Sequence, residues 1–436
     1  MLFPLFLLAA GVCTGFRLRF FCFLHPIRTW RTLLSREKSR KGGYSPLRAL
    51  TVSLAGTLGV GNITGVAAAI SLGGAGALFW MWFSALATML IKYAEIVLAV
   101  RTRECRITSR GAEYHGGPMR YLRLLPGGRI LSAVFCVLCI FASFIQGNLI
   151  QTNAAASCAV GALGLPPVLT AAGMTALAAV LMFGGRDRIG AFTEKMIPFM
   201  TALYFLAGLA VIVRNAALLP GVFADIFRDA FSLRAAAGGG GGSLMLAAMR
   251  HGCAKGVFSH EAGCGTAPIS HAGAETDSAH RQGLLGIAEV AADTLVLCTV
   301  TGLVLLLSGC RTADGDYAGL VIDAFSVRYG GAAALFLTVS VMFYAFATLV
   351  CWSFYGTECL GALISSSRAK TVYLLLFSLC SFLGAFVPCG ALWRISDLLT
   401  VSMTVINTAG VFLLTGRVKG AWNETEEKSR YHVRNV

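Results

Sequence analysis

The sequence predicts an all-α polytopic membrane protein with about 11 transmembrane helices, built as a 5+5 inverted repeat with one extra N-terminal helix. Only 13% of the 436 residues are charged, whereas a soluble domain carries roughly 25%. The apolar runs are about 20 residues long and show no alternation of polar and apolar residues, as spanning helices require and barrel strands do not. Two of these runs are interrupted by clustered glycines.

The hydropathy pattern places the spans in order along the chain. We expect them at residues 2–16, 47–72, 74–100, 130–156, 169–183, 197–213, 242–271, 284–308, 331–360, 372–387 and 395–415. The first run is short, but its basic residues, Arg17 and Arg19, follow the apolar core instead of preceding it. It is therefore expected to be a helix of the mature protein and not a signal peptide.

The charges of the loops predict the orientation in the membrane. Basic residues cluster between spans 1 and 2 (Arg28, Arg31, Arg36, Lys38, Arg40, Lys41), between spans 3 and 4 (Arg101, Arg103, Arg106, Arg110, Arg120, Arg123) and after span 11 (Arg417, Lys419, Lys428, Arg430, Arg434). The loop after span 8 is acidic instead (Asp314, Asp316, Asp323). The positive-inside rule then places the N-terminus outside and the C-terminus in the cytoplasm of a bacterial or archaeal cell. The net charge of +15 thus reflects orientation, and we expect neither nucleic acid nor an obligate protein as a partner.

The order of spans divides the chain into four parts. Residues 1–45 hold the extra helix and a basic cytoplasmic loop, and residues 46–214 form the first five-helix repeat. Residues 215–416 form an external loop and the second repeat, and residues 417–436 are a cytoplasmic tail. Because five spans separate equivalent helices, the second repeat is inverted relative to the first, as in many secondary transporters.

The glycine clusters mark the two helix breaks. The first is T-L-G-V-G-N at 57–62, and the second extends from R-H-G-C-A-K-G at 250–256 to G-C-G at 263–265. Glycine weakens a helix, and backbone groups freed inside a bilayer are tolerated only where protein or a water-filled cavity receives them. Paired breaks of this kind indicate the substrate and ion site of a transporter. The chain is accordingly expected to be no enzyme.

Several segments resemble one known family, in order along the chain. They are G-V-G-N-I-T-G-V at 59–66, K-Y-A-E at 92–95, G-G-P-M at 116–119, G-V-F-S-H-E-A-G at 256–263, A-P-I-S-H at 267–271 and W-S-F-Y-G at 352–356. Together they are similar to the alanine/glycine:cation symporter family. The resemblance implies a leucine-transporter-like fold and sodium-coupled uptake of alanine or glycine by alternating access.

The resemblance and the chemistry of the breaks give the expected site. Backbone N–H groups near the half-helix start can bind a carboxylate, and freed carbonyls can bind a cation. The candidate substrate-binding residues are Thr57, Val60, Gly61, Asn62, Gln151, Phe258 and Trp352. The candidate sodium ligands are Gly56, Gly59, Thr348 and Asp293, and no other cofactor is expected.

Three positions depart from the family pattern. Val60 replaces a threonine of the first break, and Ala347 replaces a hydroxyl-bearing residue beside Thr348. His260 stands where the family has asparagine before Glu-Ala-Gly, which adds a titratable group within the membrane. The alternatives to sodium symport are therefore a proton-coupled amino-acid transporter and a transport-dead membrane sensor that binds amino acids.

Other buried polar residues have structural interpretations. Lys92 and Glu95 are expected to form an ion pair or to anchor the end of their helix, and Asn153 to bond between helices. Burying the Asp293 carboxylate in an apolar span costs free energy. If Asp293 does not bind a cation, its alternative role is to neutralise a basic residue such as Arg250 or Lys255.

Overall fold

The computed structural model describes residues 2–34, 44–108, 111–232, 244–311, 317–387, 389–419 and 421. Every expected span corresponds to helix in these ranges. The first six are α1 (Leu2–Arg17), α4 and α5 (Pro46–Thr57, Thr64–Gly73), α6 (Gly76–Thr102), α8 and α9 (Gly128–Phe144, Ile150–Leu163), α10 (Pro167–Met182) and α11 (Gly185–Arg214). The last five are α13 and α14 (Leu244–His260, Ala267–His271), α15 and α16 (Ala279–Val290, Thr299–Leu307), α18 (Ala332–Leu363), α19 (Ser367–Gly384) and α20 (Cys389–Leu414).

The order of the elements confirms the repeat. A broken helix opens each half, α4/α5 in the first and α13/α14 in the second, and four more spans follow it. Among the described residues, six helices are long and apolar enough to cross a membrane. A seventh is added when α4 and α5, which are bent by 59°, are taken as one span.

The connecting segments contain structure that the hydropathy pattern did not predict. Helices α2 (Phe21–Leu24) and α3 (Pro26–Leu34) follow α1, and a hairpin of β1 (Glu104–Thr108) and β2 (Gly111–His115) precedes α7 (Pro118–Tyr121). Helices α12 (Leu219–Ala230) and α17 (Tyr317–Tyr329) occupy the two long loops of the second half. Short 3-10 turns complete these connections at η2 (Leu122–Leu124), η4 (Ala216–Leu218) and η6 (Thr415–Arg417).

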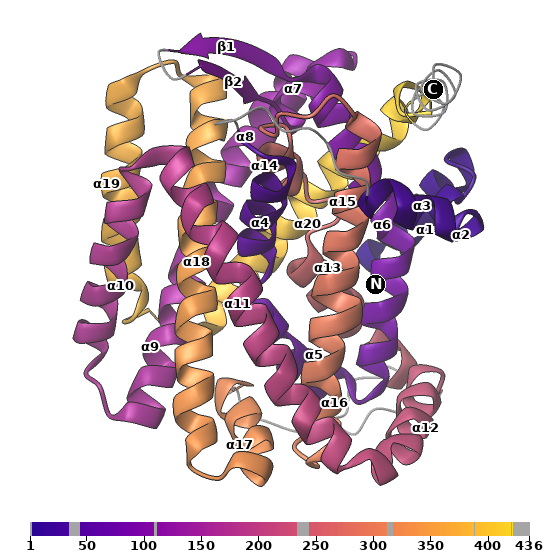
Figure 1. The fold of residues 1–436 in the computed structure, drawn as a ribbon, viewed down its shortest axis with the longest axis vertical. Coiled ribbons are helices and arrows are strands. Elements are labelled where there is room, and N and C mark those ends of the chain that lie inside the picture. The colour runs from indigo at the N-terminus through magenta and orange to yellow at the C-terminus, as the bar shows by residue number, and fades with distance from the viewer. Residues whose placement is uncertain are drawn as a thin grey trace, which may run out of the picture.

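The connections separate to opposite ends of the bundle. The hairpin, α7 and the C-terminal segment lie at one end, and α12 and α17 lie at the other (Figure 1). The described basic loop residues thus face away from Asp323 of α17, in agreement with the expected sidedness. Arg36, Lys38, Arg40, Lys41, Arg110, Asp314, Asp316, Lys428, Arg430 and Arg434 lie outside the described residues. Which end faces the cytoplasm remains a prediction.

Both breaks have a local cause. Helix α4 starts at Pro46, where Ser45 caps it by accepting the N–H of Arg48 at 3.0 Å. It ends before Gly59, and only the short turn η1 (Val60–Asn62) precedes α5. At the second break, Gly263 and Gly265 have φ of +82° and +86°, which L side chains rarely adopt. The first break and the 263–265 part of the second therefore lie where the sequence predicted. Residues 250–256, which the sequence also assigned to the second break, lie within α13, so Gly252 and Gly256 do not interrupt that helix.

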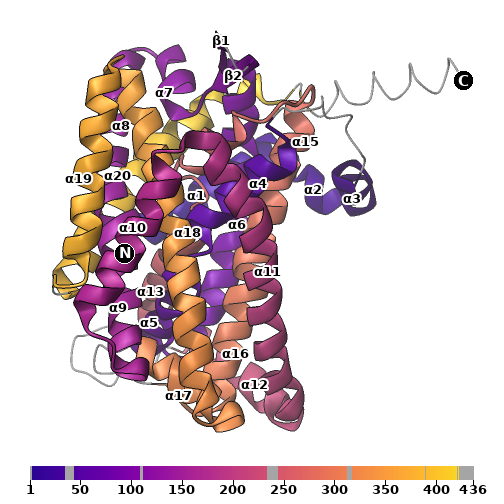
Figure 2. The ribbon, with the colours of Figure 1, turned by 60° about the vertical axis from the view of Figure 1, so that its left-hand side comes forward.

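Two further spans contain a π-helical turn, η3 (Ile145–Leu149) between α8 and α9 and η5 (Ala291–Cys298) between α15 and α16. Such turns are rare and occur often at functional sites. Helix α6 packs against both α13 and α15, and α18 packs against α8 and α9. Figure 2 shows α18 and α19 on a different side of the molecule from α15.

A fully buried ion pair joins α6 to α15. Lys92 Nζ lies 3.1 Å from Glu289 Oε1, and His271 Nε2 lies 3.2 Å from the other oxygen of Glu289. Ser53 of α4 also donates to Glu289, at 2.8 Å. The expected pairing of Lys92 with Glu95 is wrong, because α6 turns Lys92 towards α15. The pair thus connects both broken spans to α6 and α15.

This pair generates a stability prediction. Replacing Lys92→Met leaves the Glu289 charge buried without its cation, which costs about 3–5 kcal/mol in folding free energy. The double variant Lys92→Met/Glu289→Gln removes both charges and should recover most of that loss. Thermal unfolding in detergent measures both. The control is Arg48→Met, which breaks a half-exposed pair with Glu194 at 3.0 Å and should cost less than about 1 kcal/mol. Equal losses for Lys92→Met and Arg48→Met would contradict the prediction.

Candidate functional site

The first break meets α9 at Gln151. Gln151 Oε1 accepts the backbone N–H of Val60 at 3.4 Å, and its amide donates to the carbonyl of Gln146 at 3.0 Å. A Cβ atom placed on Gly59 would lie 2.6 Å from Thr348 Oγ1 and 3.2 Å from Gln151 Oε1. Gly59 is therefore the residue that lets α9 and α18 approach the unwound backbone. Four of the expected site residues meet here: Gly59, Val60, Gln151 and Thr348.

The second break covers the other side of the same backbone. A Cβ atom on Gly61 would lie 3.1 Å from the ring of Phe258. That ring packs against Trp393 with 5.0 Å between centroids. Lys255 Nζ stands 4.4 Å above the Trp393 ring and pairs with Asp397 at 3.0 Å. The structure thus brings Gly61 and Phe258 together, as expected from the sequence.

Asp293 lies at the junction of both breaks and the π-helical turn η5. Asn62 Nδ2 donates to Asp293 Oδ1 at 2.6 Å. The hydroxyls of Ser259 and Thr294 donate to Oδ2 at 2.8 and 2.7 Å. These contacts correct the alternative that Asp293 neutralises Arg250 or Lys255. A carboxylate beside amide and hydroxyl oxygens is a donor set that suits a hard cation.

The remaining expected residues support the walls of the site. Trp352 Nε1 donates to the carbonyl of Gly56 at 3.4 Å, and the Trp352 side chain lies directly against Gly147. Thr57 Oγ1 donates to carbonyls within its own helix, those of Ser53 and Leu54, at 3.3 Å each. Thr57 therefore reinforces the end of α4.

The side chains of the expected site residues are all shielded from solvent. The most exposed is Phe258, at 5%. Thr348 donates to the carbonyl of Ala55 at 2.9 Å, which holds it beside the first break. The expected cation ligands therefore lie in two groups. One group is Gly59 and Thr348 beside Gln151, and the other is Asp293 beside Asn62. The conformation is closed around the breaks.

The freed backbone of the second break is bound by side chains from distant helices. Glu95 of α6 accepts the N–H of Gly263 at 3.3 Å, and Asn407 of α20 donates to the carbonyl of Gly263 at 2.9 Å. Asn407 also donates to Glu95 at 2.7 Å. His260 Nδ1 accepts the N–H of Ala262 at 3.0 Å. Glu95 is therefore a ligand of the break, and His260 uses one ring nitrogen as an acceptor there.

Sequence reasoning missed several participants, including Asn407, Gln146, Ser259 and Glu289. Gln146 lies in η3, where its Oε1 accepts the hydroxyl of Thr400 at 2.8 Å. Ser259 bonds Asp293, and Glu289 bonds Lys92. Gln146 and Glu289 each interrupt an apolar run, which is a signal that a search for intramembrane polar residues would have detected. Asn153 donates to the carbonyls of Gly384 and Val387 at 3.1 and 2.8 Å, the interhelical role expected for it.

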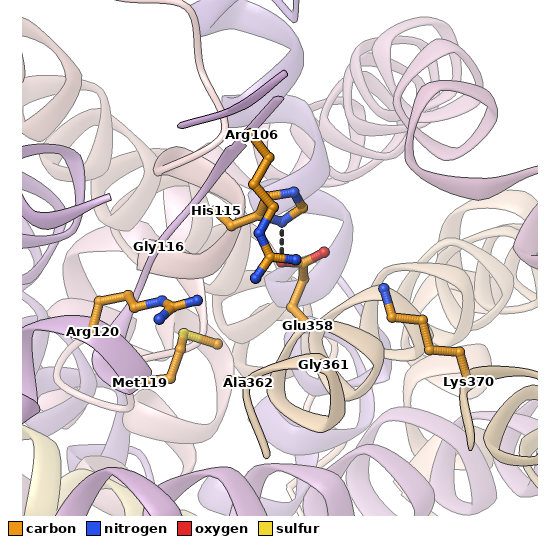
Figure 3. Close-up of a pocket in the computed structure, with 9 residues that line it drawn as sticks. All are labelled: Arg106, His115, Gly116, Met119, Arg120, Glu358, Gly361, Ala362 and Lys370. Atoms are coloured by element: carbon orange, nitrogen blue, oxygen red, sulfur yellow. Dashed lines mark hydrogen bonds and ion pairs between the residues drawn. The ribbon is translucent and has the colours of Figure 1, made fainter. Parts of the chain in front are cut away.

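A separate basic hollow lies at the hairpin end of the bundle (Figure 3). Arg106, Arg120 and Lys370 surround it, and His115 Nδ1 lies 2.8 Å from Glu358 Oε2. None of its lining residues belongs to the breaks, so it is distinct from the site described above.

Comparison with known proteins agrees with this architecture. The family model described as the sodium:alanine symporter family matches residues 1–435. The sodium/alanine symporter AgcS of Methanococcus maripaludis is 36% identical over 92% of this chain and 88% of its own. The probable sodium/glutamine symporter GlnT of Bacillus subtilis is 32% identical over 94% of this chain and 84% of its own.

Solved structures share the fold at low sequence identity. MhsT in complex with L-phenylalanine superposes with a TM-score of 0.59 at 13% identity, covering 86% of this chain and 90% of that one. A sodium-coupled sialic acid symporter gives a TM-score of 0.56 at 12% identity, covering 94% and 87%. The leucine-transporter-like fold is thus confirmed. The family match identifies the chain as a multi-pass membrane transporter. The chain belongs to the sodium:alanine symporter family, whose members are cation-coupled amino-acid symporters.

Proposed function

We propose that this symporter imports a small neutral amino acid, alanine or glycine, together with sodium by alternating access. The observation that supports this most is the crowding of the first break. Gly59 is enclosed by Thr348 and Gln151, and Gly61 by the ring of Phe258. A space bounded so closely accommodates a short side chain. Uptake into proteoliposomes, with and without a sodium gradient, tests the proposal.

The zwitterion has a partner for each charge. N–H groups at the start of α5, near Gly61 and Asn62, suit the carboxylate because helix N-termini bind anions. Carbonyls at the end of α4 and Gln151 Oε1 supply acceptors for the ammonium group. Gln151 already bridges the N–H of Val60 and the carbonyl of Gln146, so substrate would replace or extend these bonds.

Two positions are available for the coupling cation. In the first, carbonyls of the break around Gly56 and Gly59 combine with Thr348. In the second, Asp293 holds the cation with Ser259 and Asn62, which now donate to its carboxylate through a hydroxyl and an amide nitrogen. Asn62 would have to turn its amide oxygen towards the cation. We favour the first for sodium, since it adjoins Gln151, and assign Asp293 to a second cation or a proton.

The proton-coupled alternative then has one preferred carrier. Protonating His260 at Nδ1 would break its bond with the N–H of Ala262. The carboxylate of Asp293 accepts its hydrogen bonds from the side chains of Asn62, Ser259 and Thr294, so protonating it would break no bond to a backbone N–H. A sensor that binds amino acids without transport is the remaining alternative, and vectorial uptake distinguishes it. We also propose that the hairpin end faces the cytoplasm, on the positive-inside rule.

The crowding at the first break predicts the substrate range. Alanine, glycine and serine should compete for labelled alanine uptake, whereas leucine and lysine should compete at least tenfold more weakly because their side chains exceed the space beside Gly59 and Gly61. A competition series in proteoliposomes measures this. Inhibition by leucine or lysine equal to that by alanine would refute a small-substrate site. Strong competition by glutamine would indicate a glutamine transporter, as the name of GlnT states for that protein.

The position of Gln151 predicts a transport defect without unfolding. Gln151→Ala should lower alanine uptake at least tenfold, because it removes an acceptor beside the first break. The matched control is Asn153→Ala, two residues along the same helix, whose bonds go to carbonyls near the end of α19. That variant should lose thermal stability but keep the alanine KM. Unchanged kinetics for Gln151→Ala would return Gln151 to a structural role.

The coupling ion is tested at Ala347, which supplies no oxygen where the family resemblance implies a hydroxyl. A missing ligand costs about 1–3 kcal/mol, by analogy with an unmet polar partner, which is roughly a 5- to 150-fold rise in the sodium Kd. Ala347→Ser should therefore lower the sodium concentration for half-maximal uptake, with Ala345→Ser as control. No change for Ala347→Ser would refute the missing-ligand idea. Uptake that ignores sodium and follows a pH gradient would establish proton coupling.

A further inference from the structure

Helix α3 (Pro26–Leu34) has an apolar face that the protein leaves exposed. Ile27, Trp30 and Leu34 lie on one side of this helix and are each at least 60% exposed. Arg31 flanks this apolar face, and Arg28 lies further round the helix, away from it. No residue of α3 is buried, so packing within the chain does not explain this arrangement. A short amphipathic helix with basic residues outside its apolar face is typical of segments that lie in the membrane interface.

The position of α3 agrees with an interfacial role. Helices α2 and α3 project sideways from the bundle, between its two ends (Figures 1 and 2). A leaflet that meets the apolar face of α3 also meets the positive charges of Arg28 and Arg31, which attract anionic lipids.

A large basic hollow lies beside these helices. It has a volume of about 430 Å³ and is formed where α1, α2 and α6 meet the segment after α20. Arg17, Arg19, His25 and Lys419 supply its polar side, and the residues that line it include no acidic side chain. Arg17 is held in place by its bond to the carbonyl of Phe412 at 2.6 Å. The residues that line the hollow therefore give it a positive charge, mainly from Arg17, Arg19 and Lys419.

The floor of the hollow is apolar. Leu18, Phe21, Leu24 and Val418 line it beside the ring of Tyr93. The hydroxyl of Tyr93 lies 2.7 Å from His280 Nδ1, which fixes the ring between α6 and α15. A soluble anion would gain nothing from this surface, whereas the glycerol and upper acyl segments of a lipid would bury it.

We propose that this hollow binds the head group of an anionic phospholipid, with α3 lying on the surface of the same leaflet. The phosphate faces Arg19 and Lys419, and the acyl chains leave along the apolar floor into the bilayer. The site is independent of the substrate site at the breaks. Through Tyr93, the lipid contacts α6 one residue from the buried Lys92.

Lipid binding to the purified full-length protein in detergent tests the site. Phosphatidylglycerol and phosphatidylcholine are titrated separately, and native mass spectrometry counts the bound lipid. Phosphatidylglycerol should bind more tightly than phosphatidylcholine. The double variant Arg19→Gln/Lys419→Gln should weaken it roughly 30-fold, at about fivefold for each cation near an anionic surface. The control Arg214→Gln/Arg328→Gln removes two exposed charges at the end of the bundle where α12 and α17 lie, and should leave binding unchanged.

Three outcomes would overturn the proposal. These are equal affinity for the two lipids, unchanged affinity in the Arg19/Lys419 variant, or full competition by glycerol 3-phosphate, which would make the hollow a site for soluble anions. Helix α3 has its own test in proteoliposomes containing brominated phosphatidylglycerol. Trp30 should be quenched, so that Trp30→Phe reduces the quenchable fluorescence. An unchanged quenchable fraction would place α3 away from the leaflet.

Discussion

The structure depends on one constraint, which is that backbone groups freed at the two breaks must find partners inside the protein. In hydrocarbon each unmet group would cost several kcal/mol. Gln151 accepts the N–H of Val60, Glu95 accepts that of Gly263, and Asn407 binds the carbonyl of Gly263. These side chains come from α9, α6 and α20. The breaks therefore determine which helices surround them and which polar groups lie at mid-bundle.

The same constraint explains why the bundle contains buried charge. Lys92 donates to the carbonyl of His260 at 3.1 Å and pairs with Glu289, so one cation serves both the second break and α15. Ser53 of α4 bonds the same carboxylate. Separating the broken spans from α6 and α15 would leave Lys92 or Glu289 buried without its partner, so this ion pair holds the four segments together.

Much of this was predictable from the sequence, and the remainder shows the limit of such reasoning. Hydropathy gave the spans, glycines gave the breaks, and the motif resemblance led to Gln151 and Phe258. The partner of Lys92 was wrong, because Glu289 lies 197 residues away and the rotation of each helix decides which side chains meet. The same holds for Asn62 with Asp293. Helices α3 and α17 were missed because they are too short or too polar for a search for spans.

Hydrogen exchange of the backbone, measured with and without alanine and sodium, tests the central claim that the two breaks form one ligand site. The account predicts slower exchange at both segments, 59–66 and 258–266, when alanine and sodium are present together. Exchange in α10 and α19 should stay unchanged, because these helices do not contribute to the site. Protection confined to one break, or appearing only outside both, would contradict the account.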